Sequence, residues 1–281
     1  DVRFGFRRLV KNPVSTAVAV LLLAIGIGGN ATVFTVVDKT LMEPPPFVQN
    51  AQELVGLGWI VEGGPGVDFG YYDYEFYRDQ GESFSDVLAY GGFSGSQGRR
   101  TDGGGGEVAV GTEGSVEQAG AWVVSGNYFR VLGVPMGLGA GFSPEVQAGE
   151  SDAPEVILSH RYWARSFGMD PSVLDRPIYL NGSAFRVAGI TPREFRGMNP
   201  GEPVPDLFVS ILSGDALSLG FHEQLQRFSD DGSPLASRFL RLVARLEPGV
   251  DMATAHAEAA VLQVRREDEF SSWAQAVNGG N

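Results

Sequence analysis

The sequence of 281 residues contains no cysteine, so the chain can form neither a disulfide nor a thiolate metal site. Its three histidines, His160, His222 and His256, lie far apart and lack the short paired spacing that is typical of metal ligands. The sequence also lacks a G-x-S-x-G nucleophile motif and a G-x-x-x-x-G-K-S/T phosphate-binding loop. No spacing among its many carboxylates singles out an acid–base pair. We therefore predict a protein that is not an enzyme and that binds no metal or other cofactor.

Positive charge is scarce as well. The chain has 21 lysines and arginines against 34 acidic residues, which gives a net charge of -13 at pH 7. An acidic surface repels phosphate groups, so this balance argues against a nucleic-acid partner. Four basic residues nevertheless gather at the start of the chain, where only Asp1 opposes them: Arg3, Arg7, Arg8 and Lys11.

Charged side chains are absent from the 26 residues between Asn12 and Val37. As a helix this run would be about 39 Å long, which exceeds the roughly 30 Å of a hydrocarbon core. The pattern predicts a transmembrane helix over residues 12–40, followed by three prolines at 44–46 that stop it. Because short basic flanks stay on the cytoplasmic side, residues 1–11 are predicted to be cytoplasmic and the rest of the chain to be exported. A cleaved signal peptide is the alternative, since it also combines a basic start with an apolar run.

Small residues within the apolar run allow two interpretations. Residues 26–31 fit the dinucleotide fingerprint G-x-G-x-x-A, but the second strand and the acidic residue that such a site needs do not follow. In a membrane helix, Ala24, Gly28 and Thr32 would instead share one face and allow another helix to approach closely. We predict helix docking at these three residues, with plain exposure to lipid as the alternative.

Short predicted strands and helices alternate beyond the prolines, which predicts an α+β fold. Helices are expected at 68–80, 126–132, 159–167 and 251–270, and strands at 53–61, 84–93, 107–111, 115–124, 155–158 and 239–246. Ser159 is predicted to cap its helix, and Asn181-Gly182 predicts the turn of a hairpin over 178–190.

Aromatic residues cluster in the helix predicted at 68–80. Four of them fall on one side of it: Tyr71, Tyr74, Phe76 and Tyr77. We expect that side to pack into the core and the charged residues of the helix, Asp73 among them, to face solvent. Tyr72, Trp163 and Trp273 are predicted partner contacts, because aromatic residues outside a core are common at interface hot spots.

A family resemblance is carried by the anchor sequence FRRLVKNPVSTAVAVLLLAIGIGGNATVFTVV and by five later blocks. In chain order these blocks are YYDYEFYRDQGESFSDVLAY, VSGNYFRVLGVPMGLGAGF, EVILSHRYWARSFGMDPSVLDRPIYLNGSAFRVAGITPREFRG, PDLFVSI and LRLVARLEPGVDMATAHAE. Together they cover nearly the whole chain, which resembles the MacB/FtsX-type ABC transporter permeases and especially their duplicated orphan permease group.

The resemblance implies one transmembrane helix followed by a periplasmic MacB-like core of two small α+β subdomains. We expect the core over 47–270, with subdomain one at 50–132 plus 238–270, an inserted subdomain at 133–237, and a polar tail at 271–281. Permeases of this kind have three further transmembrane helices after the core, whereas no second long apolar run follows here. We therefore expect either a single-span derivative or a fragment.

Three hypotheses for the function follow. The main one is a single-span protein of the bacterial inner membrane, with a cytoplasmic amino terminus and a periplasmic bulk. It would act as an accessory or structural subunit of a larger complex, for example a respiratory or photosynthetic one, and its partners would be other membrane proteins and the lipid bilayer. The alternative is a fragment of a MacB/FtsX-type permease that serves export or mechanotransmission, in which case an ATPase subunit is a partner. An enzyme or small-ligand receptor on the same fold is the third hypothesis, since fold alone does not define function.

Overall fold

The computed structural model describes residues 47–61, 64–66, 69–91, 106–112, 115–148, 153–198, 204–217 and 239–278. All of them lie in one compact unit, which comprises residues 45–198 and 202–281. The predicted transmembrane helix at 12–40, with its docking residues Ala24, Gly28 and Thr32, lies outside the described residues. Within the described ranges, no helix is both long enough and apolar enough to cross a membrane.

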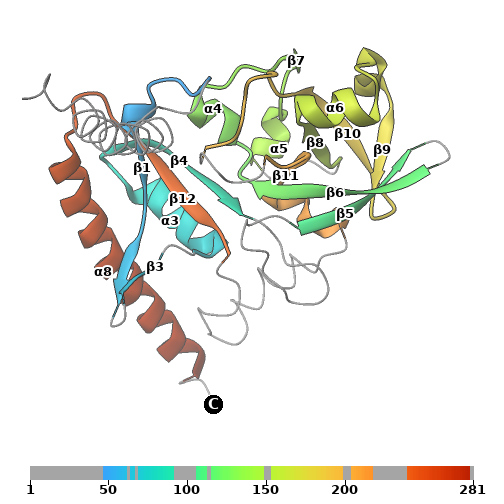
Figure 1. Cartoon of the computed structure of the whole chain (residues 1–281). Coiled ribbons are helices and arrows are strands. Elements are labelled where there is room, and N and C mark those ends of the chain that lie inside the picture. The colour runs from blue at the N-terminus through green and yellow to red at the C-terminus, as the bar shows by residue number, and fades with distance from the viewer. Residues whose placement is uncertain are drawn as a thin grey trace, which may run out of the picture. The chain divides into compact units, whose positions relative to one another are not determined.

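Strands and helices alternate along the described chain, and the fold is α+β as predicted (Figure 1). The strands are β1 (Leu54–Gly56), β2 (Trp59–Val61), β3 (Gly64–Gly66), β4 (Phe84–Gly91), β5 (Gly106–Thr112), β6 (Ser115–Val124), β7 (Leu138–Gly139), β8 (Glu155–Leu158), β9 (Pro177–Leu180), β10 (Ser183–Ile190), β11 (Leu207–Ser210) and β12 (Arg241–Leu246). The α-helices are α3 (Tyr71–Gln80), α4 (Tyr128–Leu132), α5 (Pro144–Ala148), α6 (His160–Ser166) and α8 (Met252–Asn278). Short 3-10 helices are η1 (Ala51–Glu53), η2 (Pro171–Asp175) and η3 (Ile211–Leu217).

One mixed sheet of ten strands contains two regions that share β6. In the first region β6 pairs with β4, and the sheet continues through β12 to β1, with all three pairings antiparallel. We call β4, β12 and β1 the open arm. In the second region the sheet runs from β6 through β11, β8, β10 and β9 to β5, and β5 pairs back onto β6. These six strands form a closed circle of hydrogen-bonded pairs, which we call the ring.

The ring joins strands from both sides of the predicted subdomain boundary at 132–133. Strand β6 precedes that boundary and β11 follows it, yet Ala121 pairs with Leu207. Likewise Val110 of β5 pairs with Leu180 of β9. Because these strand pairings cross the predicted boundary, they do not mark off two subdomains, and the division stays a prediction.

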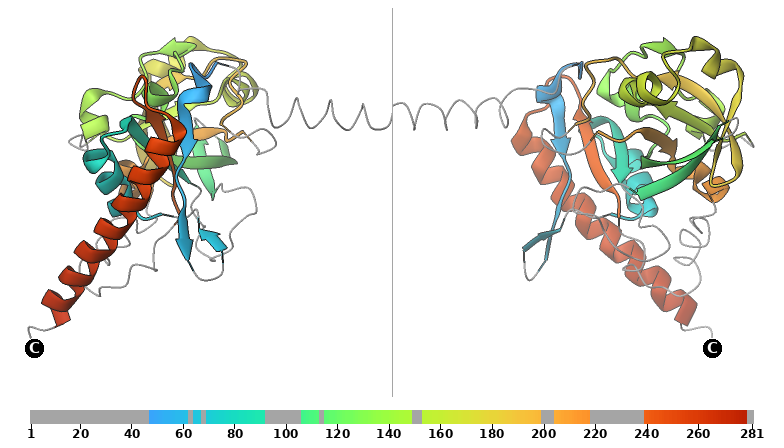
Figure 2. Two further views of the ribbon diagram at one scale, coloured as in Figure 1. Left: turned by 90° about the vertical axis from the view of Figure 1, so that its left-hand side faces the viewer. Right: turned by 45° about the vertical axis from the view of Figure 1, so that its right-hand side comes forward.

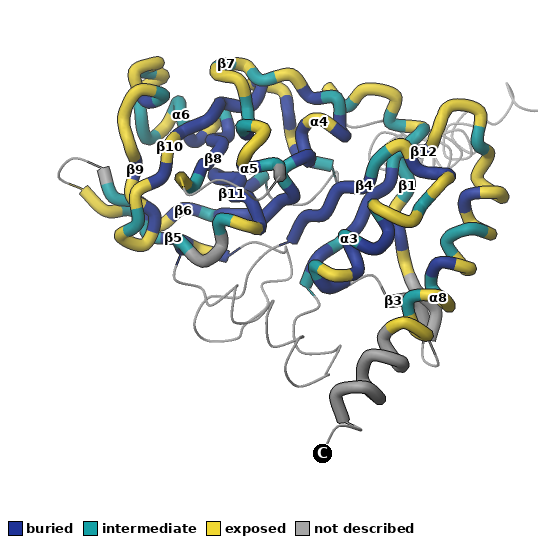
Figure 3. Tube along the Cα trace, turned by 180° about the vertical axis from the view of Figure 1, so that it is seen from behind, coloured by how far each residue is buried: buried dark blue, intermediate teal, exposed yellow. Residues whose placement is uncertain are grey.

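Side chains that alternate along the strands separate two hydrophobic cores on opposite faces of the sheet. Figure 3 shows that the central strands are buried along most of their length. Successive residues of a strand point to opposite faces, and β4 shows this directly. Val87 and Ala89 belong to the first core, which also receives side chains from α3, α6 and α8. Leu88 and Tyr90 belong to the second core, which α4 and α5 cover. Both faces of the central strands are thus buried.

Two local predictions are confirmed. The Ser159 hydroxyl accepts a hydrogen bond from the Tyr162 backbone N–H at 3.2 Å and so caps α6. Asn181 and Gly182 both have positive φ, at 51° and 90°, which is the backbone conformation of a tight two-residue hairpin between β9 and β10.

Two other local predictions need correction. The strand expected at 53–61 is interrupted, and β1 and β2 pair with different strands. Helix α8 does not end near residue 270 but continues to Asn278, so most of the segment predicted as a polar tail is helical. Its sequence there, SSWAQAVN, has no glycine or proline before residue 279 that would stop a helix.

Candidate functional site

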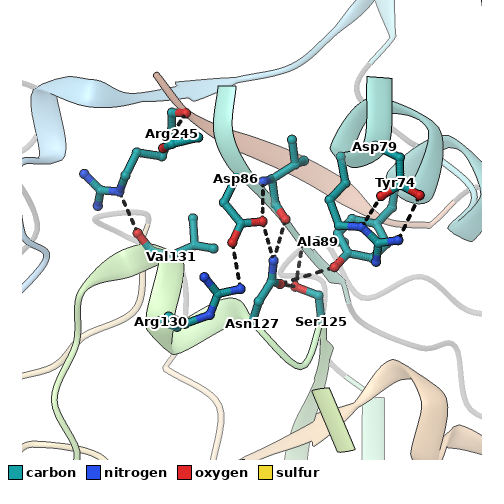
Figure 4. Close-up of polar contacts among 12 residues, drawn as sticks. Tyr74, Asp79, Asp86, Ala89, Ser125, Asn127, Arg130, Val131 and Arg245 are labelled. Atoms are coloured by element: carbon teal, nitrogen blue, oxygen red, sulfur yellow. Dashed lines mark hydrogen bonds and ion pairs between the residues drawn. The ribbon is translucent and has the colours of Figure 1, made fainter. Parts of the chain in front are cut away.

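Buried polar side chains gather where α3, β4 and α4 meet (Figure 4). Asn127, the residue before α4, is 6% exposed. Its Nδ2 donates to Asp86 Oδ1 and to the Val87 carbonyl oxygen, both at 2.8 Å. Its Oδ1 accepts from Ser125 Oγ at 2.6 Å and from the Tyr74 hydroxyl at 3.3 Å. Because both donors and both lone pairs of the amide are used, one side chain connects three elements. We call Asn127 and these four contacts the junction.

The junction is extended on the strand side by Ser125 and on the helix side by Arg130. The Ala89 backbone N–H donates to Ser125 Oγ at 3.0 Å, and the Ser125 N–H donates back to the Ala89 carbonyl at 2.8 Å. Arg130 of α4 forms an ion pair with Asp86 at 2.8 Å, with an arginine side chain that is 63% exposed. Since a pair of this exposure contributes at most about 1 kcal/mol, the buried amide of Asn127 is the stronger connection.

Arg245 of β12 attaches the amino-terminal segment of the domain to α4. Its Nε donates to the Val131 carbonyl at 2.9 Å, and its Nη2 donates to the Gln49 carbonyl at 2.8 Å. Its Nη1 forms an ion pair with Glu53 at 2.9 Å. The Gln49 N–H in turn donates to the Leu132 carbonyl at 3.0 Å. The guanidinium of Arg245 therefore connects α4 to the segment that contains Gln49 and Glu53, which leads into the first strand of the sheet.

The same segment lies against a glycine that ends α4. Gly133 has φ 65° and its N–H donates to the Arg130 and Phe129 carbonyls, as in a left-handed C-cap. A Cβ added at this position would lie 2.7 Å from Gln49 Cβ. Glycine here allows both the cap and the close approach of the amino-terminal segment.

Asp73 of α3 is buried, whereas the helical pattern predicted it to face solvent. Its Oδ2 accepts from the Gly70 backbone N–H at 2.8 Å, and its Oδ1 accepts from Arg266 Nε of α8 at 2.5 Å. The prediction was wrong because the partner that stabilises this carboxylate is supplied by a residue 193 positions further along the chain. The neighbouring Tyr72 hydroxyl donates to Glu269 Oε2 of α8 at 2.9 Å.

Glu258 connects α8 to the other end of α3. Its carboxylate accepts from the backbone N–H groups of Glu82 at 2.6 Å and Ser83 at 2.7 Å, just after α3 ends. Burial raises the pKa of the Glu258 carboxyl. The hydrogen bonds from Ser83 and from these N–H groups lower the pKa, and together they outweigh burial, so the pKa lies below the ordinary value of 4.5. Helix α8 therefore holds α3 at both ends.

The tyrosine hydroxyls of α3 stay protonated. Burial raises the pKa of Tyr77 to about 12. Burial also raises the pKa of Tyr74, although the nearby Arg78 opposes this. The Tyr74 hydroxyl is therefore a stable donor to Asn127 at neutral pH.

The arrangement connects α3, β4, α4 and β12. Among the residues that the structure describes, no group of three His, Cys, Asp or Glu side chains could hold a metal ion. The polar atoms of the junction are bonded to one another and to backbone groups rather than directed at an open site. That the protein is not an enzyme and has no cofactor stays a prediction.

The three predicted partner-contact residues lie in three separate helices. Tyr72 is 48% exposed, with its hydroxyl bonded to α8. Trp163 of α6 packs against the first core, and its Nε1 donates to the Asp170 carbonyl at 2.9 Å. Trp273 belongs to α8, and its side chain lies outside the described part of the structure. Partner contact at each of them stays a prediction.

Sequence reasoning did not single out Asn127, Arg245 or Arg266. Asn127 stands in the block VSGNYF that carries the family resemblance, which is the signal that could have drawn attention to it. Arg245 is the second basic residue of the otherwise apolar strand RLVARL, an unusual position for a charge. Arg266 has no comparable signal, because its significance depends entirely on contact with α3.

These observations define an α+β domain whose amino-terminal segment and carboxyl-terminal helix are both tied to the sheet by side-chain contacts. The model of the MacB-like periplasmic core domain family matches residues 16–262, and the chain belongs to this family. The predicted resemblance is thereby confirmed. A comparison with curated proteins gives no match.

Three transporter or permease domains are among the solved structures to which the chain is similar. The extracellular domain of the noncanonic ABC-type transporter YknZ from Gram-positive bacteria is 13% identical and has a TM-score of 0.45, with coverage of 72% of this chain and 85% of that one. The periplasmic region of MacB from Actinobacillus actinomycetemcomitans is 13% identical with a TM-score of 0.48 and coverage of 77% and 87%. A domain of a putative permease protein from Porphyromonas gingivalis is 14% identical with a TM-score of 0.47 and coverage of 75% and 79%.

The family assignment bears on the functional hypotheses. A MacB-like periplasmic core domain over most of the chain fits the predicted alternative, a piece of a MacB-type permease. It gives no support to an accessory subunit of a respiratory or photosynthetic complex. The alternative is therefore the better supported of the two.

Proposed function

We propose that this chain contains the extracytoplasmic part of a MacB-type ABC transporter permease, and that this domain transmits movement between the segments that enter and leave it. The family assignment supports the class of protein. The observation that carries the mechanism is that both of these segments are held by buried or half-buried side chains, the first by Arg245 and the second by Asp73 and Glu258.

A continuous series of contacts runs between the two segments. Arg266 of α8 binds Asp73 of α3, and Tyr74, the next residue of α3, donates to Asn127. Asn127 binds Asp86 and Val87 of β4, and Asp86 pairs with Arg130 of α4. The carbonyl of the next residue, Val131, accepts from Arg245, which holds Gln49 and Glu53. Because packed elements move as units, a displacement of α8 would reach the amino-terminal segment through this series.

The proposed topology follows the sequence. Residues 12–40 would anchor the chain in the membrane with residues 1–11 in the cytoplasm, so that the described domain lies outside it. The energy would come from an ATPase subunit, as the resemblance to MacB/FtsX-type permeases implies. Membrane proteins and the lipid bilayer are the other partners.

Co-purification tests the class of protein. The full chain, carrying an affinity tag at its carboxyl terminus, is isolated from its native membrane in mild detergent, and its partners are identified by mass spectrometry. We expect an ATPase subunit with a G-x-x-x-x-G-K-S/T loop to be recovered. Recovery of respiratory or photosynthetic subunits without such an ATPase would instead support the accessory-subunit hypothesis.

Substitution of Arg245 tests the mechanism. Arg245→Gln removes the ion pair with Glu53 and most of the hold on Gln49, so we expect export by the assembled transporter to fall severalfold while the free energy of unfolding falls by only about 1–2 kcal/mol. The matched control is Arg176→Gln, which removes an exposed pair with Asp170 at 3.4 Å in the ring region. Equal export by the two variants would contradict a role of Arg245 in transmission.

A further inference from the structure

Helix α8 contacts α3 along a single face, and the contacts run antiparallel. The residues of that face are spaced by three or four positions: Ala255, Glu258, Leu262, Arg266 and Glu269. The first of them lie near the end of α3 and the start of β4, whereas Arg266 and Glu269 lie at the start of α3. Residues 270–278 then extend beyond the α3 contact by about 14 Å of helix (Figure 2).

The proximal part of this face is held by packing and by backbone groups. Leu262 is 1% exposed and Ala255 is 3% exposed, and both belong to the first hydrophobic core. Glu258 binds two backbone N–H groups, whose positions are set by the turn between α3 and β4. To lift this part of α8 off the domain would expose the core.

In the described part of α8, the contacts of the distal part with α3 are made by side chains. Arg266 reaches Asp73, and Glu269 reaches the hydroxyl of Tyr72, which is half exposed. Long side chains can break and reform such contacts without exposing a core. The Asp73 carboxylate has a second partner, the Gly70 N–H at the start of α3. If Arg266 leaves, Asp73 therefore keeps a hydrogen bond and a place at a helix amino terminus, where negative charge is favourable.

We propose that residues 266–278 of α8 form a latch that closes on α3 through Arg266 and Glu269 and opens there while residues 252–262 remain docked. Opening and closing of the latch would decide whether movement of the distal helix reaches the series of contacts that begins at Asp73. This use of the latch rests on the proposed function, but the existence of the latch does not, since it is a property of the isolated chain.

Hydrogen exchange on a matched pair of variants tests the latch. Arg266→Gln removes the charge that binds Asp73, and Arg265→Gln removes the same charge at the neighbouring position, whose side chain is exposed. Exchange is followed by mass spectrometry on the full chain in detergent. In Arg266→Gln we expect amides of residues 264–278 to exchange about tenfold faster, as for the loss of one partly buried ion pair, with residues 252–262 and the ring unchanged. Arg265 lies near Glu258 of the proximal part, so Arg265→Gln should match the wild type over residues 264–278.

Two further variants separate the latch from a general loss of stability. Arg266→Lys keeps the charge and should restore part of the protection, and Tyr72→Phe removes only the bond to Glu269 and should cause a smaller increase confined to the same region. The proposal is overturned if Arg266→Gln leaves residues 264–278 unchanged, or if it raises exchange equally in α8 and in the ring. Neither result depends on recovery of an ATPase, so failure of the latch and failure of the proposed function can be told apart.

Discussion

In the ring every strand has a hydrogen-bonded neighbour on each side, whereas β1 at the end of the open arm pairs with β12 alone among the described strands. Closure removes free edges and holds the ring through the backbone itself. The open arm instead gains its outer contacts from side chains of α3, α8 and the amino-terminal segment, several of them charged. The region that receives both ends of the domain is thus the one whose outer contacts include charged side chains.

The comparison also shows why the junction lies where it does. Asn127 follows β6, the strand that belongs to both regions, and it binds β4, the first strand of the open arm. A buried and fully bonded amide at this place specifies one geometry, because any other would leave polar atoms unpaired. The ring and the open arm are therefore joined by this contact set in addition to the strand pairing.

The largest effect is expected from the ring. Phe208 of β11 is fully buried and contacts Phe129, Tyr128 and Phe195, with ring centroids 5.1, 6.1 and 6.1 Å away. Phe208→Ala should lower the free energy of unfolding by about 3–5 kcal/mol, because it removes a large side chain from a closely packed core. Chemical denaturation measures this loss.

The matched control for this substitution is an aromatic residue on the outer surface of the same ring. Tyr179 of β9 is 48% exposed, so Tyr179→Ala should cost less than about 1 kcal/mol. An equal loss in free energy of unfolding in both variants would show that the core around Phe208 does not stabilise the ring more than its outer surface does.

An intermediate effect is expected at the junction. Asn127→Ala removes the partner of Tyr74, Ser125, Asp86 and the Val87 carbonyl at once, and should lower the free energy of unfolding by about 2–3 kcal/mol. Hydrogen exchange should rise more in α3 and β4 than in the ring. Gln118→Ala, at an exposed amide of β6, is the control and should change neither quantity. A uniform rise in exchange would show that the two regions do not separate at Asn127.

The smallest effect is expected from pH at Glu258. Since its folded pKa lies below 4.5, its contribution to stability is fully present above the unfolded value and is lost as pH falls through the folded pKa. Between about pH 6 and pH 3.5 the wild type should lose protection at the Glu82 and Ser83 amides beyond what Glu258→Gln loses. Amide hydrogen exchange, corrected for the effect of pH on the intrinsic exchange rate, measures the difference in protection between the two proteins. Identical pH profiles would mean that the carboxylate does not hold the start of β4.

Several elements follow from nearby residues alone. The hairpin of β9 and β10 follows from Asn181-Gly182, and the start of α6 follows from Ser159, because both features depend on neighbouring residues. The α+β character follows from the alternation of short strands and helices, and the MacB-like family follows from blocks such as VSGNYF. Docking at Ala24, Gly28 and Thr32 remains a prediction, as do partner contacts at Tyr72, Trp163 and Trp273.

Other features depend on contacts between distant parts of the chain. The periodicity of α3 places Asp73 on the polar side of the helix, and only the arrival of α8 makes that side an interior one. The closure of the ring likewise requires β5 to meet β9 and β6 to meet β11, pairings that no local pattern specifies.

The sequence by itself determined the approximate positions of several helices and strands, the acidic and cysteine-free character of the chain, and its family. Tertiary structure alone decided that β6 serves two regions, that Asn127 joins them, and that Arg245 and Arg266 hold the two ends of the domain. The physical reason is the distance along the chain over which each interaction acts. Backbone propensity and capping act over a few residues, whereas the burial of a charge depends on which distant side chain arrives to pair with it.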